Sequence, residues 1–294
     1  MAIQVTMHVF SGRPDPTWIL DSRQTDDLMD IIRAANTPTN TKALGAFGNL
    51  GYRGFSVEGT LPLDFGAQSR SFSLFTNEGV LDHGASFPSY LESQPTIEKY
   101  LLDTGIKHLH PDVASVVQNS LTQPPSPQSF SPQMFNAPAT QCPTSVAADA
   151  PVYDPGKWNI PSVQPYNNCY AYANDQITNT FPQPGRATGK PITGLSCGGV
   201  QPSAVSDGLR ATSGFNTPLA SGEGWYAALV IWPGQDYHWY RQDTVGCWSH
   251  KPGQTAARNT DNRGRPIADP ATAARGPYTD FCTYMVTNRR VTIR

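Results

Sequence analysis

The stretch 224–243 reads GWYAALVIWPGQDYHWYRQD and predicts the centre of a β-sheet. Its first half is a continuous apolar run that stops at a Pro-Gly turn, which is typical of a buried strand. The second half, DYHWYRQD, follows that turn directly and is expected to pair with the first half as a hairpin. Further strands of an antiparallel sheet are predicted for VGCWSHKPG (245–253), FCTYMVTN (281–288) and RRVTIR (289–294).

The stretch YNNCYAYANDQ (166–176) predicts a helix before this sheet. Asn168 is a good N-cap residue for a helix over Cys169–Thr178. Ala173 and Ile177 fall on one face of that helix. A thiol in the first helical turn has three explanations: buried packing, half of a disulfide, or an activated nucleophile, since helix N–H groups lower a cysteine pKa.

The N-terminal part predicts a smaller α+β module. IQVTMHVF (3–10) alternates with period two, as a strand does, and Asp21–Ala35 has helical periodicity with early acidic residues. Two more helices are expected to begin at Pro95 and Pro111, since proline is tolerated at the first helical position. His108 and His110 have a spacing that would suit a metal on a strand, and we interpret them instead as part of a solvated turn between helices.

The predicted fold class is α+β, with a division into three parts. Residues 1–121 form the N-terminal module, whose role is unknown. Residues 122–151 contain seven prolines and no charge before Asp149, which predicts a linker or an extended wrapping segment. Residues 152–294 form the C-terminal domain, in which a helix packs on the antiparallel sheet.

Charge and hydropathy limit the partners of this 294-residue chain. The formal net charge is −2 and basic residues form no run, so nucleic acid is not expected as a partner. No apolar stretch approaches the length of about 18 residues that a membrane span requires. The N-terminus does not resemble a signal peptide, so we expect a cytoplasmic protein, export by a route without such a peptide, or a leader already removed.

Five cysteines leave at least one unpaired within the chain. Two disulfides plus one thiol are arithmetically possible, and Cys247 with Cys282 is a conceivable pair. Without a secretion signal, we expect all five to be reduced. Cys169 is the candidate nucleophile, and Cys197, in the glycine-rich LSCGG, is its rival. The spacing of the cysteines and histidines suits no zinc site, and no cofactor is expected.

The two histidines that follow Cys169 are the candidate bases. His238 lies in the middle of a predicted strand, where alternation places Asp243 on the other face and so prevents it from orienting the ring. His250, on the next strand, is the first choice for the orienting residue and is also the rival base. Asn259 and Asp261 remain alternatives for a third member of the site.

Other side chains are candidates for binding a substrate. Arg186 could clamp a carboxylate with its guanidinium, and Asn168, Trp239 and Tyr240 lie beside the predicted reacting groups. The aromatic residues of the two hairpins are expected mostly in the core. An exposed row of them would instead provide a platform for sugar or peptide rings.

A cysteine that opens a helix, followed by a histidine on a strand and a polar residue on the next strand, resembles the papain-like superfamily. The resemblance is greatest to its NlpC/P60 and CHAP branches of peptidases and amidases. It implies that Gln164, five residues before Cys169, donates to an oxyanion. The Asn-Asn-Cys-Tyr context departs from the known branches, and so does the position of the histidine.

A second resemblance is carried by NNCYAYANDQITNTFPQPGRATG and DYHWYRQDTVGCWSHKPGQTAARNTDNRG, within roughly residues 150–294. These stretches resemble a sparsely characterised family of bacteria and marine invertebrates, some of whose members are shell-matrix proteins. That resemblance implies no established activity.

The leading hypothesis from the sequence is a cysteine peptidase or amidase. Cys169 would attack a peptide or amide bond to form an acyl-thioester, and His238 would protonate the leaving amine. One alternative is a non-catalytic, aromatic-rich glycan- or peptide-binding or matrix module. Another is an acyl transferase or cyclase that uses the same thiol. The sequence does not determine the substrate or the oligomeric state.

Overall fold

The computed structural model describes residues 3–34, 37–39, 49–62, 69–77, 80–82, 89–91, 96–122, 142–144 and 146–294. The chain divides into two compact units. Unit 1 comprises Met1–Val9, Asp15–Phe47 and Tyr52–Ser131, and unit 2 comprises Phe10–Pro14, Gly48–Gly51 and Pro132–Arg294. Each unit combines helices with an antiparallel sheet, so the predicted α+β class is confirmed. Residues 123–141, the centre of the predicted linker, lie outside the described residues.

Unit 1 contains a sheet with the strand order β2-β1-β4-β5-β6-β7-β3. Helix α1 begins with a capping box: the Asp21 carboxylate accepts from the Gln24 N–H at 2.8 Å, and the Gln24 side chain accepts from the Asp21 N–H at 3.0 Å. The elements are β1 (Ile3–Met7), β2 (Thr17–Leu20), α1 (Ser22–Ala34), β3 (Thr37–Thr39), β4 (Phe55–Pro62), β5 (Ser69–Asn77), β6 (Val80–Asp82), β7 (Ser89–Leu91), α2 (Thr96–Gly105), η1 (Ile106–His108) and α3 (Pro111–Thr122).

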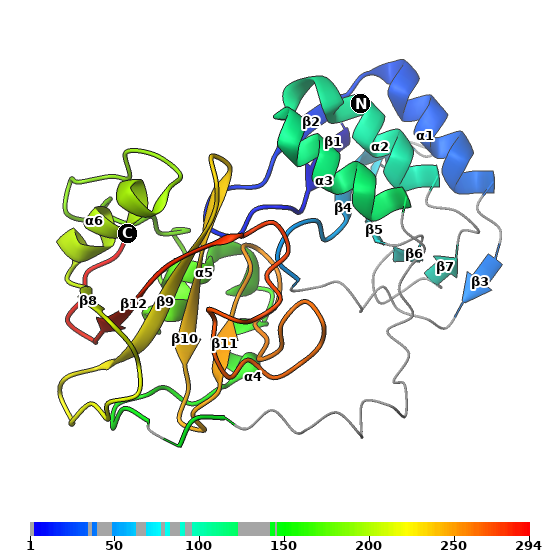
Figure 1. Cartoon of the computed structure of the whole chain (residues 1–294). Helices are drawn as coiled ribbons and strands as arrows, with labels where there is room; N and C mark the ends of the chain where they lie inside the picture. The colour runs from blue at the N-terminus through cyan, green and yellow to red at the C-terminus, as the bar shows by residue number, and fades with distance from the viewer. Residues whose placement is uncertain are drawn as a thin grey trace. The chain divides into compact units, whose positions relative to one another are not determined.

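Unit 2 contains a sheet with the strand order β11-β10-β9-β12-β8, shown in Figure 1. The predicted central hairpin is confirmed, because β9 and β10 pair antiparallel across the Pro-Gly turn. The elements are α4 (Pro155–Trp158), η3 (Gln164–Tyr166), α5 (Cys169–Ala173), α6 (Cys197–Asp207), β8 (Arg210–Thr212), β9 (Trp225–Trp232), β10 (Asp236–Gln242), β11 (Trp248–His250) and β12 (Asp280–Thr287).

Two element predictions in unit 2 were wrong. RRVTIR (289–294) forms no strand, and the edge beside β12 is occupied by β8, which the sequence analysis missed. Helix α5 ends at Ala173 instead of Thr178. The physical reason is local: Asn174 is the C-cap, and Asp175 has a φ of 49°, which a right-handed helix cannot continue.

The core of unit 2 lies between α5 and the sheet. Every residue of β9 and β10 is buried, and α5 packs against β10 (Figure 1). The aromatic residues of the two hairpins are all buried, as expected for a core: Trp225, Tyr226, Trp232, Tyr237, Trp239, Tyr240 and Trp248. No exposed aromatic row therefore exists on these strands to serve as a binding platform.

The cysteines correct the prediction that all five are reduced. Cys142 is bonded to Cys247, and Cys197 is bonded to Cys282. Cys169 alone of the five is free, and it is buried. The sequence contained no information on which thiols approach one another, because the paired residues are 105 and 85 positions apart.

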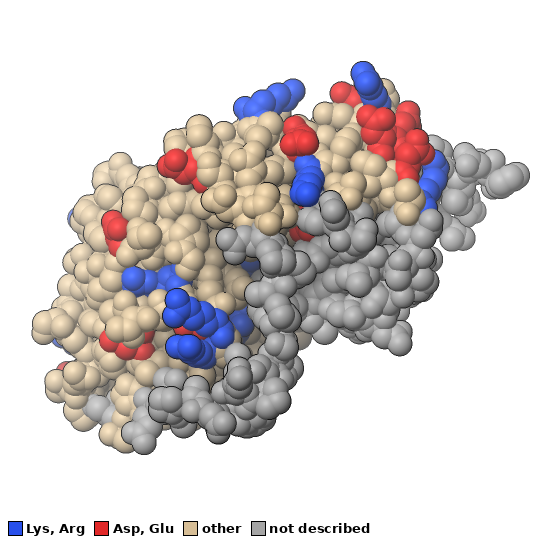
Figure 2. Space-filling model, turned by 45° about the vertical axis from the view of Figure 1, so that its right-hand side comes forward, with Lys and Arg blue, Asp and Glu red and all other residues tan. Residues whose placement is uncertain are grey.

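The described surface carries few charges. In the face shown in Figure 2, uncharged residues predominate, and side chains of both signs are interspersed among them. None of the helices that the structure describes combines the length and the apolar character needed to cross a membrane. Among the described residues, no group of three or more His, Cys, Asp and Glu side chains could hold a metal ion.

Candidate functional site

The two asparagines before Cys169 organise the surrounding backbone of unit 2. The Asn168 side chain accepts from the N–H groups of Tyr170 and Ala171, both at 3.1 Å, and so caps α5 as predicted. Its amide also donates to the carbonyl oxygens of Gly12 and Pro182, both at 2.8 Å. Because all of these bonds are internal and Asn168 is fully buried, the side chain is not free to contact a substrate.

Cys169 lies in the hydrophobic core of unit 2 and is fully buried. Burial raises the pKa of its thiol to about 12, and the nearby Asp236 carboxylate adds to this increase. A hydrogen bond with Ser11 and the charge of Lys251 act in the opposite direction but are outweighed. Helix α5 has only five residues, so its dipole cannot offset the desolvation. The thiol is therefore protonated at neutral pH.

Ser11 lies next to Cys169 and binds His238. The Ser11 hydroxyl is 2.5 Å from His238 Nδ1, and His238 Nε2 is 3.0 Å from His250 Nδ1. His250 Nε2 is 3.1 Å from the carbonyl oxygen of Thr260, to which it can only donate. For imidazole rings that carry one proton each, this fixes the direction of the other two hydrogen bonds: Ser11 donates to His238, and His238 donates to His250. The structure thus brings the two predicted histidines together.

Asp236 holds the loop that carries Ser11. Its carboxylate accepts from the backbone N–H groups of Ser11, Gly12 and Arg13 at 2.5 to 3.2 Å, and from the Tyr278 hydroxyl at 2.5 Å. Three successive N–H groups that converge on one anion form a nest. Burial nevertheless raises the pKa of Asp236 to about 6, because desolvation outweighs these hydrogen bonds.

Gly12 is required by the close approach of this loop to β10. A Cβ atom at Gly12 would lie 2.4 Å from the Tyr237 ring, so only glycine fits. The Gly12 carbonyl also accepts from Tyr237 and from Gln183, at 3.1 and 2.8 Å. The loop 10–14 is therefore an integral part of unit 2.

The remaining predicted site residues are Gln164, Arg186, Trp239 and Tyr240. The Gln164 carbonyl oxygen accepts from the buried Lys251 ammonium at 2.6 Å. Arg186 is exposed, and its backbone N–H donates to the carbonyl oxygen of Gln183 within a turn. Trp239 and Tyr240 are fully buried; the Trp239 ring packs against Tyr170 with centroids 5.4 Å apart.

Tyr240 and the rival nucleophile Cys197 also have partners inside the protein. Tyr240 stacks on His250 with ring centroids 5.0 Å apart. Cys197, the rival nucleophile, has no thiol because it is bonded to Cys282.

The Ser11–His238–His250 chain has the connectivity of a proton relay but lacks access for a substrate. The three residues have exposed fractions of 0%, 0% and 1%. The Ser11 N–H is bonded to Asp236, which fixes the loop over the histidines. The arrangement can orient protons and satisfy buried polar groups, and it holds β10, β11 and the loop 10–14 together.

Sequence reasoning missed Ser11, Asp236 and Tyr278. In the sequence, SGRPDP (11–16) indicates only a turn, and Ser11 lies 225 residues from Asp236. One signal was present: a Ser-Gly-Arg turn exposes successive N–H groups that can bind a carboxylate. Nothing in the sequence indicated which carboxylate that would be.

The fold defines a disulfide-bonded α+β protein, and its cluster of Ser11, Cys169, Asp236, His238 and His250 is buried. Comparison with known proteins places the chain within a family. It is 50% identical over 133 residues to insoluble matrix shell protein 1 of Ruditapes philippinarum. The match covers 45% of this chain and 87% of that protein, so the chain belongs to the family of insoluble matrix shell protein 1.

Other comparisons gave no match. No protein-family model and no solved structure matches the chain. The resemblance to shell-matrix proteins is confirmed, whereas the resemblance to papain-like enzymes receives no support.

The family corrects the prediction of a cysteine hydrolase. The relative is described as a shell matrix protein, which overturns the interpretation of the chain as a cysteine peptidase, amidase or other thiol protease. The raised pKa of Cys169 agrees with this correction, because nucleophilic attack needs a thiolate. The acyl transferase alternative requires the same thiolate and meets the same objection.

Proposed function

We propose that this chain is a non-catalytic structural protein of an extracellular matrix. The observation that carries the proposal is the protonated, fully buried thiol of Cys169, in a chain that is 50% identical over 133 residues to an insoluble shell matrix protein. The Cys169 thiol, which would be the reactive group of a cysteine hydrolase, packs in the hydrophobic core instead. This is the matrix form of the alternative drawn from the sequence.

The disulfides support an extracellular location. Cys142–Cys247 joins the predicted proline-rich linker (122–151) to the turn before β11, and Cys197–Cys282 joins α6 to β12. Disulfides persist in oxidising compartments and are rare in the cytosol. Cross-links over 85 and 105 residues also restrict the unfolded chain, which suits a protein that must last in a matrix.

The test combines thiol chemistry with assembly. Native protein is treated with iodoacetamide between pH 6 and pH 9, and all five cysteines are mapped by peptide digestion. We expect Cys169 to be unlabelled until the chain is unfolded, and the other four to be labelled only after reduction. Rapid labelling of native Cys169 below pH 7 would contradict a structural role.

The assembly measurement follows the same oxidised protein as its concentration rises. We expect a growing fraction to sediment as large, non-covalent material. Cys169→Ala is the matched control, since a structural thiol is dispensable for assembly. A protein that remains dispersed and monomeric at every concentration would overturn the matrix proposal.

A further inference from the structure

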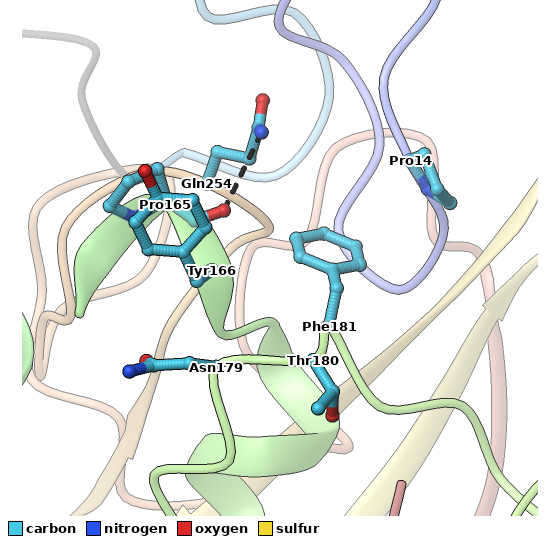
Figure 3. A pocket seen from close by; sticks show the side chains of 7 residues that line it. All are labelled: Pro14, Pro165, Tyr166, Asn179, Thr180, Phe181 and Gln254. Carbon is cyan, nitrogen blue, oxygen red and sulfur yellow. Dashed lines mark hydrogen bonds between the residues drawn. The ribbon is translucent and has the colours of Figure 1, made fainter. Parts of the chain in front are cut away.

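An open pocket of about 330 Å³ lies on unit 2, and none of its lining residues belongs to the group Ser11, Cys169, Asp236, His238 and His250. Four of its lining residues present rings: Pro14, Pro165, Tyr166 and Phe181. In Figure 3 the Phe181 ring stands between Tyr166 and Pro14, and the polar side chains occupy the borders. Tyr166 is 53% exposed, so its ring is available to a ligand.

The loop that forms one side of this pocket has an unfavourable backbone conformation. Asn179 and Phe181 have φ angles of 54° and 51°. A bulky residue such as phenylalanine rarely adopts this left-handed region, and such conformations persist only where the surroundings impose them. Strained residues of this kind cluster at binding sites, which directs attention to the ring that the loop presents.

Asn167 imposes this conformation from inside the protein. Its buried side-chain oxygen accepts from the N–H groups of Thr178 and Asn179 at 2.9 and 3.0 Å, and its amide donates to the Asn179 side chain at 2.7 Å. The Phe181 N–H donates to the carbonyl oxygen of Tyr166 at 2.8 Å. The first asparagine of YNNCY therefore holds the loop that lines the pocket, and the tyrosine before it is itself a lining residue.

The chemistry of the pocket selects an uncharged ligand. Among the residues that the structure describes, no Lys, Arg, Asp, Glu or His lines it, so a charged group would lose hydration without gaining a partner there. Asn179, Thr180 and Gln254 offer hydrogen-bonding groups beside the rings. The Gln254 amide is 3.5 Å from the Pro165 carbonyl oxygen, a contact long enough to be exchanged for a ligand carbonyl. Proline-rich peptides bind grooves of this composition, lined by aromatic rings and hydrogen-bond donors.

The chain itself contains a ligand of this chemistry. Residues 123–141 read QPPSPQSFSPQMFNAPATQ, with five prolines and no charged side chain. We propose that the pocket binds this proline-rich stretch of a second copy of the chain. The inference rests on the proposed matrix function, since one copy would donate a segment and accept another. A contact between two different surfaces of the same chain is heterologous, and where its rotation does not close a ring, repetition extends the assembly.

The experiment uses a fluorescent synthetic peptide of residues 123–141 and the intact, oxidised protein. We expect fluorescence anisotropy to show saturable binding, and a peptide with its five prolines replaced by alanine to bind at least tenfold more weakly. Tyr166→Ala and Phe181→Gly are expected to weaken binding at least tenfold. Phe181→Gly relieves the positive φ, so we expect this variant to stay folded, and its thermal unfolding is measured beside its binding. Val245→Ala, at a 68% exposed position that does not line the pocket, is the matched control and should bind as the unchanged protein does.

Sedimentation of the full chain then identifies the source of the segment. We expect Tyr166→Ala, and separately a full chain with the five prolines replaced, to lose concentration-dependent association. Peptide binding by a chain that never associates would place the segment in its own pocket and overturn the second-copy proposal. Absence of peptide binding overturns the pocket assignment, while persistent sedimentation of that protein would leave the matrix function standing. Saturable binding of a neutral oligosaccharide instead of the peptide, lost in the same variants, would assign the pocket to a glycan.

Discussion

The cluster around Cys169 and the pocket beside Tyr166 start only three residues apart in the sequence, yet they use opposite kinds of chemistry. The cluster holds the thiol, Asp236 and two histidines, and all of them are buried. The pocket is lined by rings, amides and the hydroxyls of Tyr166 and Thr180, and it is open. Reactive residue types therefore do not locate the accessible surface of this protein. Burial decides whether a titratable side chain can reach a ligand or only packs inside the protein.

The largest expected effect concerns the disulfides of unit 2. Replacing Cys197 and Cys282 together with serine should lower the free energy of unfolding by about 2–5 kcal/mol, because the unfolded chain regains the freedom of an 85-residue loop. Urea denaturation with and without reductant measures it. Cys169→Ala is the control and should cost distinctly less. Equal losses would mean that the thiol and the disulfide contribute alike, and the distinction between them would fail.

Removal of the Asp236 carboxylate should be the next largest effect. Asp236→Ala leaves three backbone N–H groups and the Tyr278 hydroxyl without their acceptor, which is expected to cost about 3 kcal/mol. Tyr278→Phe deletes one of these bonds and should cost about 1 kcal/mol. Thermal unfolding compares the two variants. A loss for Asp236→Ala no greater than that for Tyr278→Phe would show that water replaces the acceptor and that the cluster is open.

The stability of the cluster should depend on pH in the direction opposite to that of an ordinary paired carboxylate. Asp236 has a pKa of about 6 in the folded protein, against 3.8 for an unperturbed aspartate, so the folded state binds the proton more tightly. Its stabilising contribution is present below about pH 4 and is lost as the pH rises through about 6, by about 3 kcal/mol in total.

Urea titrations at pH 4, 5, 6 and 7 measure this effect. Asp236→Asn is the comparison, because it cannot ionise and its stability should change less over the same range. Asp243, whose pKa is also raised to about 6 by burial, contributes equally to both proteins and cancels in the difference. A difference between the two proteins that does not vary with pH would contradict a desolvated Asp236.

The smallest effect separates stability from binding in the pocket. Phe181→Gly should change the free energy of unfolding by no more than about 1 kcal/mol, with a gain expected from relief of the positive φ. Asn167→Ala should instead cost about 2 kcal/mol, because buried N–H groups of the loop lose their acceptor. Chemical denaturation measures the free energy of unfolding of both variants. A large loss for Phe181→Gly would show that the ring belongs to the core and is not held ready for a ligand.

Much of the fold was predictable from local pattern. The apolar run of β9, its Pro-Gly turn and the aromatic alternation of β10 give a hairpin whatever surrounds them, because strand periodicity and turn chemistry are local. The same holds for the Asn168 cap and the capping box of α1. RRVTIR failed because its alternation indicates a strand, whereas the neighbouring edge of β12 is already paired with β8.

The sequence by itself determined the α+β class, the central hairpin, the helix cap at Asn168 and the membership in the family of insoluble matrix shell protein 1. Tertiary structure alone decided the environment of the reactive side chains. It determined which cysteines pair, that Ser11 reaches His238, and that Cys169 is desolvated. The reason is that propensity and periodicity act over a few residues. Desolvation, disulfide pairing and hydrogen bonds across more than 200 residues depend on which surfaces meet in the folded chain.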